Sequence, residues 1–443
     1  MLVRFMMPFV ASNLLQVLYS LVDMMIVGRY VGSTGLSGVS QGSVIVLFAA
    51  MLSLGFCNSS QTLVAQLIGA GRRDELKKVI GTLLTLTAAL GLTLSALLVI
   101  FRRLFVAAIS VPAESFEMAV TYVLICGAGT IFTCGYNAVA AVLRGMGDSR
   151  HPFMFIAISS VLNVILDLVF TGWMKLGVGG AAFATAFSQM VSLVLSLRLL
   201  IKRRGEVGFV LKLSSFRPDC MYLGKMVRLG VPLAIQACAI NITMLMVNSF
   251  VNQVGVAASA TFGVGIKVDD LALKVALAVQ YAAAPMIAQN MGAGDEKRVK
   301  SVVYWTWLIC GIIFGAFTAA LLTCGRQIFG MFTDDPEVLE LAPVFIQAIV
   351  LSFPAMALMR GSSSFLHGTG NSLIIMIFAL LDSGLRAVVC YIMGVSLGLG
   401  FYGFVLGYAA APYGAAIPGT LYFLFGKWKG KRLVSSGTAQ KAE

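Results

Sequence analysis

Two acidic residues stand inside long apolar runs in the first half of the chain, and neither has a basic residue near it. Asp23 lies in a run at 7–27 and Asp167 in a run at 152–172. If these runs cross a membrane, a charge at the bilayer centre costs roughly 2.5 kcal/mol or more. Asn163 lies one helical turn before Asp167 on the same helix face. The carbonyl and carboxylate can bind a small cation, or the carboxylate a proton; the alternative is hydrogen bonding between helices.

The second half differs because its charged residues occur at spacings that allow pairing. An apolar run at 257–288 contains Lys267, Asp269, Asp270 and Lys274, and a run at 372–395 contains Asp382 and Arg386. Residues three or four apart share a helix face, so we expect the pairs Lys267–Asp270, Asp270–Lys274 and Asp382–Arg386. Asp269 points about 100° away from Asp270 and is expected to be the least paired. These residues form either an internal network or the charged wall of a cavity or second ion site.

The composition shows what must position these residues. The chain has 443 residues, of which 59% are hydrophobic and 12% charged, whereas soluble domains have roughly 45–50% and about 25%. A soluble enzyme is therefore excluded. Apolar runs of about 20 residues recur along the whole chain, and each can cross a bilayer core of roughly 30 Å as a helix. The net charge of +13 is therefore not expected to bind nucleic acid.

We predict twelve membrane spans in this polytopic, all-α protein. They cover 7–27, 36–60, 79–101, 118–141, 152–172, 180–201, 226–252, 257–288, 303–324, 341–364, 372–395 and 402–426. The eight Cys residues have no regular spacing, so neither a disulfide framework nor a metal cluster is expected. No nucleophile–base pair or phosphate-binding loop is present either. The pattern favours neither an enzyme nor a protein with a bound cofactor.

The Lys and Arg residues predict the orientation of the chain in the membrane. Alternate connecting segments contain nearly all of them: Arg4; Arg72, Arg73, Lys77 and Lys78; Arg144 and Arg150; the basic segment 198–228; Lys297, Arg298 and Lys300; Arg360; and Lys427, Lys429, Lys431, Arg432 and Lys441. Basic connections lie on the cytoplasmic side of membrane proteins. Both termini are therefore expected in the cytoplasm.

The chain also repeats itself at an offset of 223 residues. The matched pairs include Gly32 and Gly255, Gln66 and Gln289, Gly71 and Gly294, Gly147 and Gly370, and Gly177 and Gly400. Each copy has an even number of spans, so the two copies enter the membrane from the same side and are related by a parallel pseudo-twofold repeat. We expect six-helix bundles at 1–201 and 226–426, a cytoplasmic linker at 202–225 and a cytoplasmic tail at 427–443.

Four motifs indicate a family. They are the strings at 21–28, around Asp23; Ala65-Gln66 with Gly69-Ala70-Gly71; Leu143 to Asp148; and Ala288 to Gly294. Each string is weak alone, but together, in order and repeated at one offset, they are specific. Over essentially its whole length the chain resembles the multidrug and toxic compound extrusion (MATE) transporters of the prokaryotic type.

The resemblance implies a cation-coupling site in the amino-terminal bundle. Its residues are Asp23, Tyr122, Asn163, Asp167 and Thr185, with Asp23, Asn163 and Asp167 as candidate Na⁺ ligands. The residues at the same places in the second copy are Met246, Phe345, Arg386, Cys390 and Tyr408. This second set cannot form an equivalent cation site, so coupling is expected in one bundle only.

The resemblance further implies an antiporter that exports organic, mainly cationic, drugs or toxic metabolites in exchange for Na⁺ or H⁺ by alternating access. Asn13, Gln16 and Tyr19 share a helix face with Asp23 and either line the cavity or join helices. We expect a monomer in the inner membrane of a prokaryote, with lipid and small molecules as its partners and no nucleic acid. The alternatives are a lipid-linked oligosaccharide flippase, which would favour an unmatched cationic cavity, and an uncoupled channel.

Overall fold

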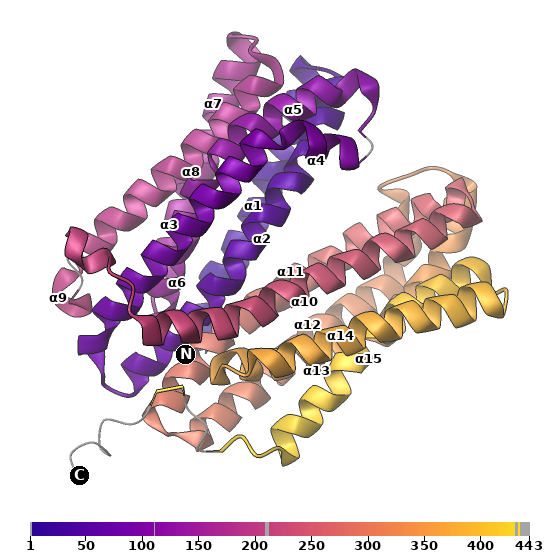
Figure 1. The fold of residues 1–443 in the computed structure, drawn as a ribbon. Helices are drawn as coiled ribbons and strands as arrows, with labels where there is room; N and C mark the ends of the chain where they lie inside the picture. Colours follow the sequence, from indigo (N-terminus) through magenta and orange to yellow (C-terminus); the bar gives the residue numbers. More distant parts are fainter. Residues whose placement is uncertain (1, 110, 209–211, 430–432, 435–443) are drawn as a thin grey trace. The chain divides into compact units, whose positions relative to one another are not determined.

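The protein is described from a computed structural model, which covers residues 2–109, 111–208, 212–429, 433 and 434. The described residues contain no strand. The α-helices are α1 (Leu2–Tyr30), α2 (Ser33–Gly69), α3 (Leu76–Ile100), α4 (Arg102–Ala108), α5 (Ala113–Ala128), α6 (Thr130–Gly145), α7 (Arg150–Asp167), α8 (Gly177–Lys202), α9 (Arg204–Val207), α10 (Cys220–Val254), α11 (Val256–Ala293), α12 (Glu296–Gly330), α13 (Pro336–Thr369), α14 (Ser372–Val389) and α15 (Gly400–Phe425) (Figure 1).

Four short elements complete the chain. Two are 3₁₀ helices, η1 (Arg73–Glu75) and η3 (Leu213–Phe216), and two are π-helices, η2 (Leu168–Trp173) and η4 (Cys390–Ser396). Of the basic residues that predict orientation, Lys431, Arg432 and Lys441 lie outside the described residues.

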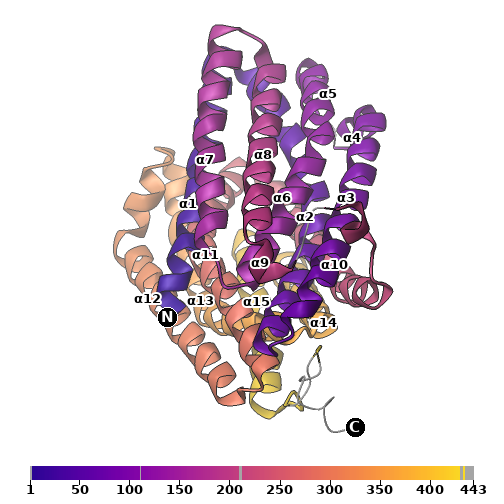
Figure 2. The same cartoon turned by 90° about the vertical axis from the view of Figure 1, so that its left-hand side faces the viewer.

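The chain divides into two compact units, and each is described by itself. The N unit is built mainly from Met7–Ala234 and the C unit mainly from Ile235–Leu433. In the N unit, α2 packs against α3, α5 and α6, and α8 packs against α5, α6 and α7 (Figures 1 and 2). In the C unit, α13 is central and packs against α11, α12 and α15, while α14 packs against α15. The division falls inside α10, whose first turns therefore belong to the N unit.

The helices have the lengths and the apolar composition of membrane spans. Ten of them in the described chain meet both requirements, and α5 with α6, bent by 45° across Gly129, makes an eleventh. The last predicted span coincides with α15, whose 26 residues are enough to cross. Its glycines, prolines and tyrosines make it less hydropathic than the other spans. The bend at Gly129 accompanies a close approach to Ala186 of α8, where a Cβ on residue 129 would lie 2.8 Å from that of Ala186.

The repeat in the sequence is also a repeat of the backbone. Positive φ angles occur in matched pairs 223 residues apart: Gly32 with Gly255, Gly71 with Gly294, Gly147 with Gly370, Gly177 with Gly400, and Lys175 with Gly398. Glycine is favoured at these angles because it has no Cβ, so the repeated glycines mark corners between helices. The π-helices η2 and η4 follow the same offset. Both halves therefore have the same chain path.

The structure corrects the predicted position of Arg360. The sequence analysis counted it among the basic residues at the cytoplasmic side, near the end of the predicted span 341–364. In the structure α13 continues to Thr369, so Arg360 lies nine residues inside the helix, or about 14 Å from its end. Two of the serines that follow it form hydrogen bonds: Ser362 with Thr420, and Ser364 with the carbonyl of Gly361. Arg360 is therefore an interior cation of the C unit.

Candidate functional site

The N unit brings together the five predicted coupling residues from four helices. Asp23 is on α1, Tyr122 on α5, Asn163 and Asp167 on α7, and Thr185 on α8. Asp167 is completely buried, Asn163 is 3% exposed, and Tyr122 is also buried. An apolar cluster of Val27, Val39, Tyr122, Cys126, Val178, Ala181 and Ala182 joins α1, α2, α5 and α8. This packing holds together α1, α5 and α8, which carry Asp23, Tyr122 and Thr185.

The polar groups of this site are arranged as acceptors that lack donors. The Nδ2 atom of Asn163 donates to the Oγ1 atom of Thr185 over 3.5 Å, which leaves the amide oxygen of Asn163 unbonded. Oδ1 of Asp23 and both carboxylate oxygens of Asp167 are also buried without a hydrogen-bond donor among the described residues. The side chains of Asp23 and Asp167 interact directly with each other. Two interacting buried carboxylates favour a proton or a cation between them, because ionised carboxylates only accept hydrogen bonds and repel one another.

The local backbone also marks this position. Asp167 is the last residue of α7, and the π-helix η2 follows it at once. π-Helical turns inside membrane helices occur frequently at functional sites. The η2 segment is held tightly against α8, since a Cβ on Gly180 would lie 3.0 Å from the carbonyl carbon of Phe170. Asp167 is therefore fixed at a break in the regular helix rather than on a uniform helical face.

The other polar residues of α1 differ in their relation to this site. Tyr19 is half-buried and interacts electrostatically with Asp23. Gln16 is exposed and Asn13 is half-buried. The described residues contain no cluster of three or more His, Cys, Asp or Glu side chains that could hold a metal ion. A bound Na⁺ would therefore depend on the two carboxylates, the amide oxygen of Asn163 and other oxygen donors.

Four of the five equivalent positions in the C unit hold apolar or aromatic side chains, and the fifth holds Arg386. Phe345 is buried, and its ring lies 5.9 Å from that of Phe262 between centroids. The ring of Tyr408 contacts both, at 5.7 Å from Phe262 and 6.5 Å from Phe345. Cys390 is buried, and its Sγ donates to the carbonyl of Phe404. Met246 is half-buried. Side chains thus occupy the place that corresponds to the acidic pair of the N unit.

Two of the three predicted ion pairs of the C unit are present. Arg386 pairs with Asp382 at 2.9 Å, and Lys274 pairs with Asp270. The predicted pair between Lys267 and Asp270 is wrong, because Lys267 is exposed and forms no ion pair with Asp270 in the described structure. An acid four residues before a base is the better arrangement on a helix, which favours Lys274 as the partner.

Asp269, predicted to be the least paired of these acids, forms no ion pair among the described residues but accepts a hydrogen bond from another helix. The hydroxyl group of Tyr408 on α15 donates to Oδ2 of Asp269 over 2.6 Å. The carboxylate is only 2% exposed, and its other oxygen, Oδ1, has no donor. Sequence spacing on one helix could not reveal this partner, because the two residues are 139 positions apart.

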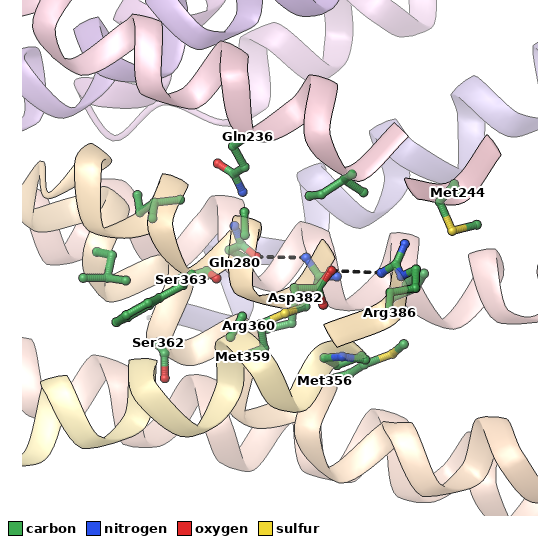
Figure 3. Close-up of a pocket in the computed structure, with 18 of the residues that line it drawn as sticks. Gln236, Met244, Gln280, Met356, Met359, Arg360, Ser362, Ser363, Asp382 and Arg386 are labelled. Atoms are coloured by element: carbon green, nitrogen blue, oxygen red, sulfur yellow. Dashed lines mark hydrogen bonds and ion pairs between the residues drawn. The ribbon is translucent and has the colours of Figure 1, made fainter. Parts of the chain in front are cut away.

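A cavity of about 240 Å³ lies within the C unit (Figure 3). Its polar lining residues include Gln236, Gln280, Arg360, Asp382 and Arg386. The Nη1 atom of Arg360 donates to Oε1 of Gln280 over 3.2 Å. Sequence analysis missed Arg360 as a cavity residue. A sequence signal for this was present. Gly370 is the repeat partner of Gly147, which follows the end of α6, so the helix that contains Arg360 should also continue almost to Gly370.

The helical bundles, the parallel repeat and the unneutralised buried acids define the class of protein as a polytopic membrane transporter built from two repeats. The MatE family model matches residues 8–169 and again residues 232–392. The chain therefore belongs to the MatE family, the multidrug and toxic compound extrusion transporters, as the motifs predicted. The two matches begin at Pro8 and Pro232 and correspond to the two copies found by the internal repeat.

Similar proteins share nearly the full length of the chain. The probable multidrug resistance protein YoeA of Bacillus subtilis is 29% identical over 415 residues, which cover 92% of this chain and 89% of that protein. The probable multidrug resistance protein NorM of Thermotoga maritima is 25% identical over 438 residues, covering 98% and 93%. The multidrug export protein MepA of Staphylococcus aureus is 24% identical over 400 residues, covering 90% and 88%.

Solved structures confirm the predicted fold. A crystal structure of MATE in the bent conformation has a TM-score of 0.89 at 22% identity and covers 96% of this chain and 94% of that one. A transporter of the MOP superfamily from Pyrococcus furiosus has a TM-score of 0.88 at 22% identity, with the same coverage. The fold is therefore the twelve-helix, two-bundle fold of MATE transporters.

Proposed function

We propose that this protein is an ion-coupled antiporter that exports organic compounds by alternating access, with Na⁺ or H⁺ as the coupling ion. The observation that carries the proposal is the direct interaction of Asp23 with Asp167, whose buried oxygens have no donor in the described chain. Binding of the ion between the two carboxylates removes their repulsion and draws α1 towards α7. Release of the ion reverses this change. The occupied and free states therefore favour different arrangements of the N unit.

The names of the relatives favour efflux over the two alternatives, a flippase and a channel. We propose that the protein acts as a monomer in the inner membrane of a prokaryote, with both termini in the cytoplasm. The buried site of the N unit holds an ion and not a reacting bond, so the proposal includes no enzymatic step and no cofactor. Organic cations remain the sequence-based prediction for the cargo.

The test is transport by the purified protein in proteoliposomes under an imposed Na⁺ gradient and, separately, an imposed pH gradient. Wild-type protein should transport a fluorescent organic substrate under one of the two gradients and not when both are collapsed. Asp23→Asn should insert normally and lose gradient-driven transport. Glu117→Gln is the matched control, because Glu117 is an exposed acid on α5 that pairs with Arg103 away from the site. Equal transport with and without gradients would overturn the proposal in favour of a channel.

A further inference from the structure

The cavity of the C unit has a polarity opposite to that of the N-unit site. Two arginines, Arg360 and Arg386, line it, whereas Asp382 is the only acid among its lining residues. Both guanidinium groups act electrostatically on Asp382, which lies between them in Figure 3. The wall that faces the cavity therefore has one positive charge in excess.

The hydrogen bonds of the cavity show the same imbalance. The Nε atoms of Arg360 and Arg386 are buried and have no acceptor among the described residues. Each arginine has one bonded partner on the cavity wall, Gln280 for Arg360 and Asp382 for Arg386. A guanidinium group has five N–H donors in a planar fork, so most of its donating capacity remains available. Buried donors without acceptors cost free energy, so the two guanidinium groups are not fully satisfied by the protein.

One further acid lies close to the arginines without lining the cavity. Asp269 interacts electrostatically with both Arg360 and Arg386. Its Oδ2 atom already accepts from Tyr408, and the side chain is buried. Arg386 also lies over the ring of Tyr408, with 5.6 Å from Cζ to the ring centroid. Tyr408 therefore packs on Arg386 at the cavity wall, and Asp382 is the only acid among the residues that line the cavity.

The rest of the lining is apolar and adaptable. It includes Met244, Met356 and Met359 together with Phe378. Methionine side chains adjust to different shapes and make favourable contacts with aromatic rings. The cavity is smaller than a typical drug-sized site of roughly 300–1,000 Å³. It therefore suits one acidic group with an adjoining apolar or ring portion.

We propose that this cavity is a substrate site for amphiphilic organic acids, whose anionic group is held between the guanidinium groups of Arg360 and Arg386. Planar guanidinium forks bind carboxylate, sulfonate and phosphate groups with paired hydrogen bonds, and this geometry distinguishes such acids from organic cations. The inference rests on the proposed transport function, and it gives organic acids instead of the predicted organic cations as the chemical class of the cargo.

The experiment compares two probes that share one fluorophore and differ in charge. Dansylglycine carries a carboxylate, and dansyl ethylenediamine carries an ammonium group. Binding of each to the purified full-length protein in lipid nanodiscs is measured by fluorescence titration at equilibrium, with no ion gradient. Wild-type protein should bind dansylglycine at least about tenfold more tightly than the amine, since one charged hydrogen bond typically contributes such a factor.

The variants distinguish the effect of the positive charge from that of the planar guanidinium group and from any loss of folding. Arg360→Gln should weaken dansylglycine binding about tenfold, and Arg360→Lys should recover part of this loss because it keeps the charge. The double variant Asp382→Asn with Arg386→Gln removes both partners of a buried pair and should also weaken the anionic probe. Arg326→Gln is the control, because Arg326 is an exposed arginine on α12 outside the cavity.

Two outcomes would overturn the inference: equal or tighter binding of the amine by wild-type protein, or unchanged dansylglycine binding by folded Arg360→Gln. Because the binding is measured without a gradient, these results do not depend on ion coupling. A failure of gradient-driven transport would instead overturn the proposed function and leave the binding preference intact.

Discussion

The two units have the same backbone path and opposite chemistry at equivalent positions. In the N unit, Asp167 precedes a π-helix and contacts Asp23, and the site consists of oxygens without donors. In the C unit, Cys390 takes the place of Asp167, and the nearby cavity has arginine donors without acceptors. The repeat preserves the positive-φ corners between helices, while the side chains decide which charge each unit can bind.

A second pair of equivalent residues makes the same point on a smaller scale. Thr185 of α8 and Tyr408 of α15 lie 223 positions apart. Thr185 accepts a hydrogen bond from Asn163, whereas Tyr408 donates one to Asp269. Each residue orients one polar neighbour. Thr185 leaves the amide oxygen of Asn163 available, whereas Tyr408 occupies one of the two carboxylate oxygens of Asp269.

The largest effect is expected from Asp167→Asn. This variant should lose nearly all gradient-driven transport, because an amide cannot carry the charge that the coupling ion neutralises. It should also melt at the same or a higher temperature than wild type, because it removes the repulsion between two buried carboxyl groups. Proteoliposome transport and a thermal-shift measurement on the same preparation check both parts. Full coupling in this variant would show that the acidic pair is not the coupling site.

In the C unit the corresponding removal of charge should destabilise the protein. Arg386→Met leaves Asp382 buried without its ion-pair partner, which typically costs about 3–5 kcal/mol. Adding Asp382→Asn should restore most of the loss, because the uncompensated charge is then gone. The measurement is thermal unfolding followed by size-exclusion chromatography. A melting temperature unaffected by Arg386→Met would mean that the pair makes no contribution.

A smaller change is expected from Tyr408→Phe. The substitution removes the donor to Asp269 and leaves a buried carboxylate with neither oxygen bonded, at a cost of about 1–3 kcal/mol. Because the ring is retained, its contacts with Phe262 and Phe345 should persist. Thermal unfolding checks the size of the effect, with Tyr413→Phe as the control, since Tyr413 is exposed and donates to a backbone carbonyl. Equal shifts in both variants would contradict the special role of Asp269.

The smallest effect is expected from Thr185→Ala in the N unit. The hydrogen bond that it removes is long, at 3.5 Å, and joins two neutral groups. Its loss should cost about 1 kcal/mol, which corresponds to roughly a fivefold higher ion concentration for half-maximal transport. Thr185→Ser should restore the wild-type value. An unchanged ion dependence in Thr185→Ala would show that Asn163 does not need this orientation.

Much of the N-unit site could be predicted from the sequence because its evidence is local. Asp23 and Asp167 are conspicuous in apolar runs, and Asn163 lies one turn from Asp167 on the same helix. The glycine repeat predicted the positions where the chain turns, since residues with positive φ are mostly glycine. Lys175 is the exception, and it takes the place of Gly398 in the second copy.

The sequence by itself determined the membrane class, the repeat and the acids without basic neighbours, because hydropathy, helical period and glycine positions are properties of neighbouring residues. Only the tertiary structure decided that Arg360 lies inside a helix and bonds Gln280, 80 positions away, and that Tyr408 donates to one oxygen of Asp269. It also decided that Lys267 is exposed while Lys274 pairs with Asp270. Arg360 and Tyr408 have partners on other helices, and the two lysines compete for Asp270 on the same helix. Their choice depends on how the helices pack, which no local spacing specifies.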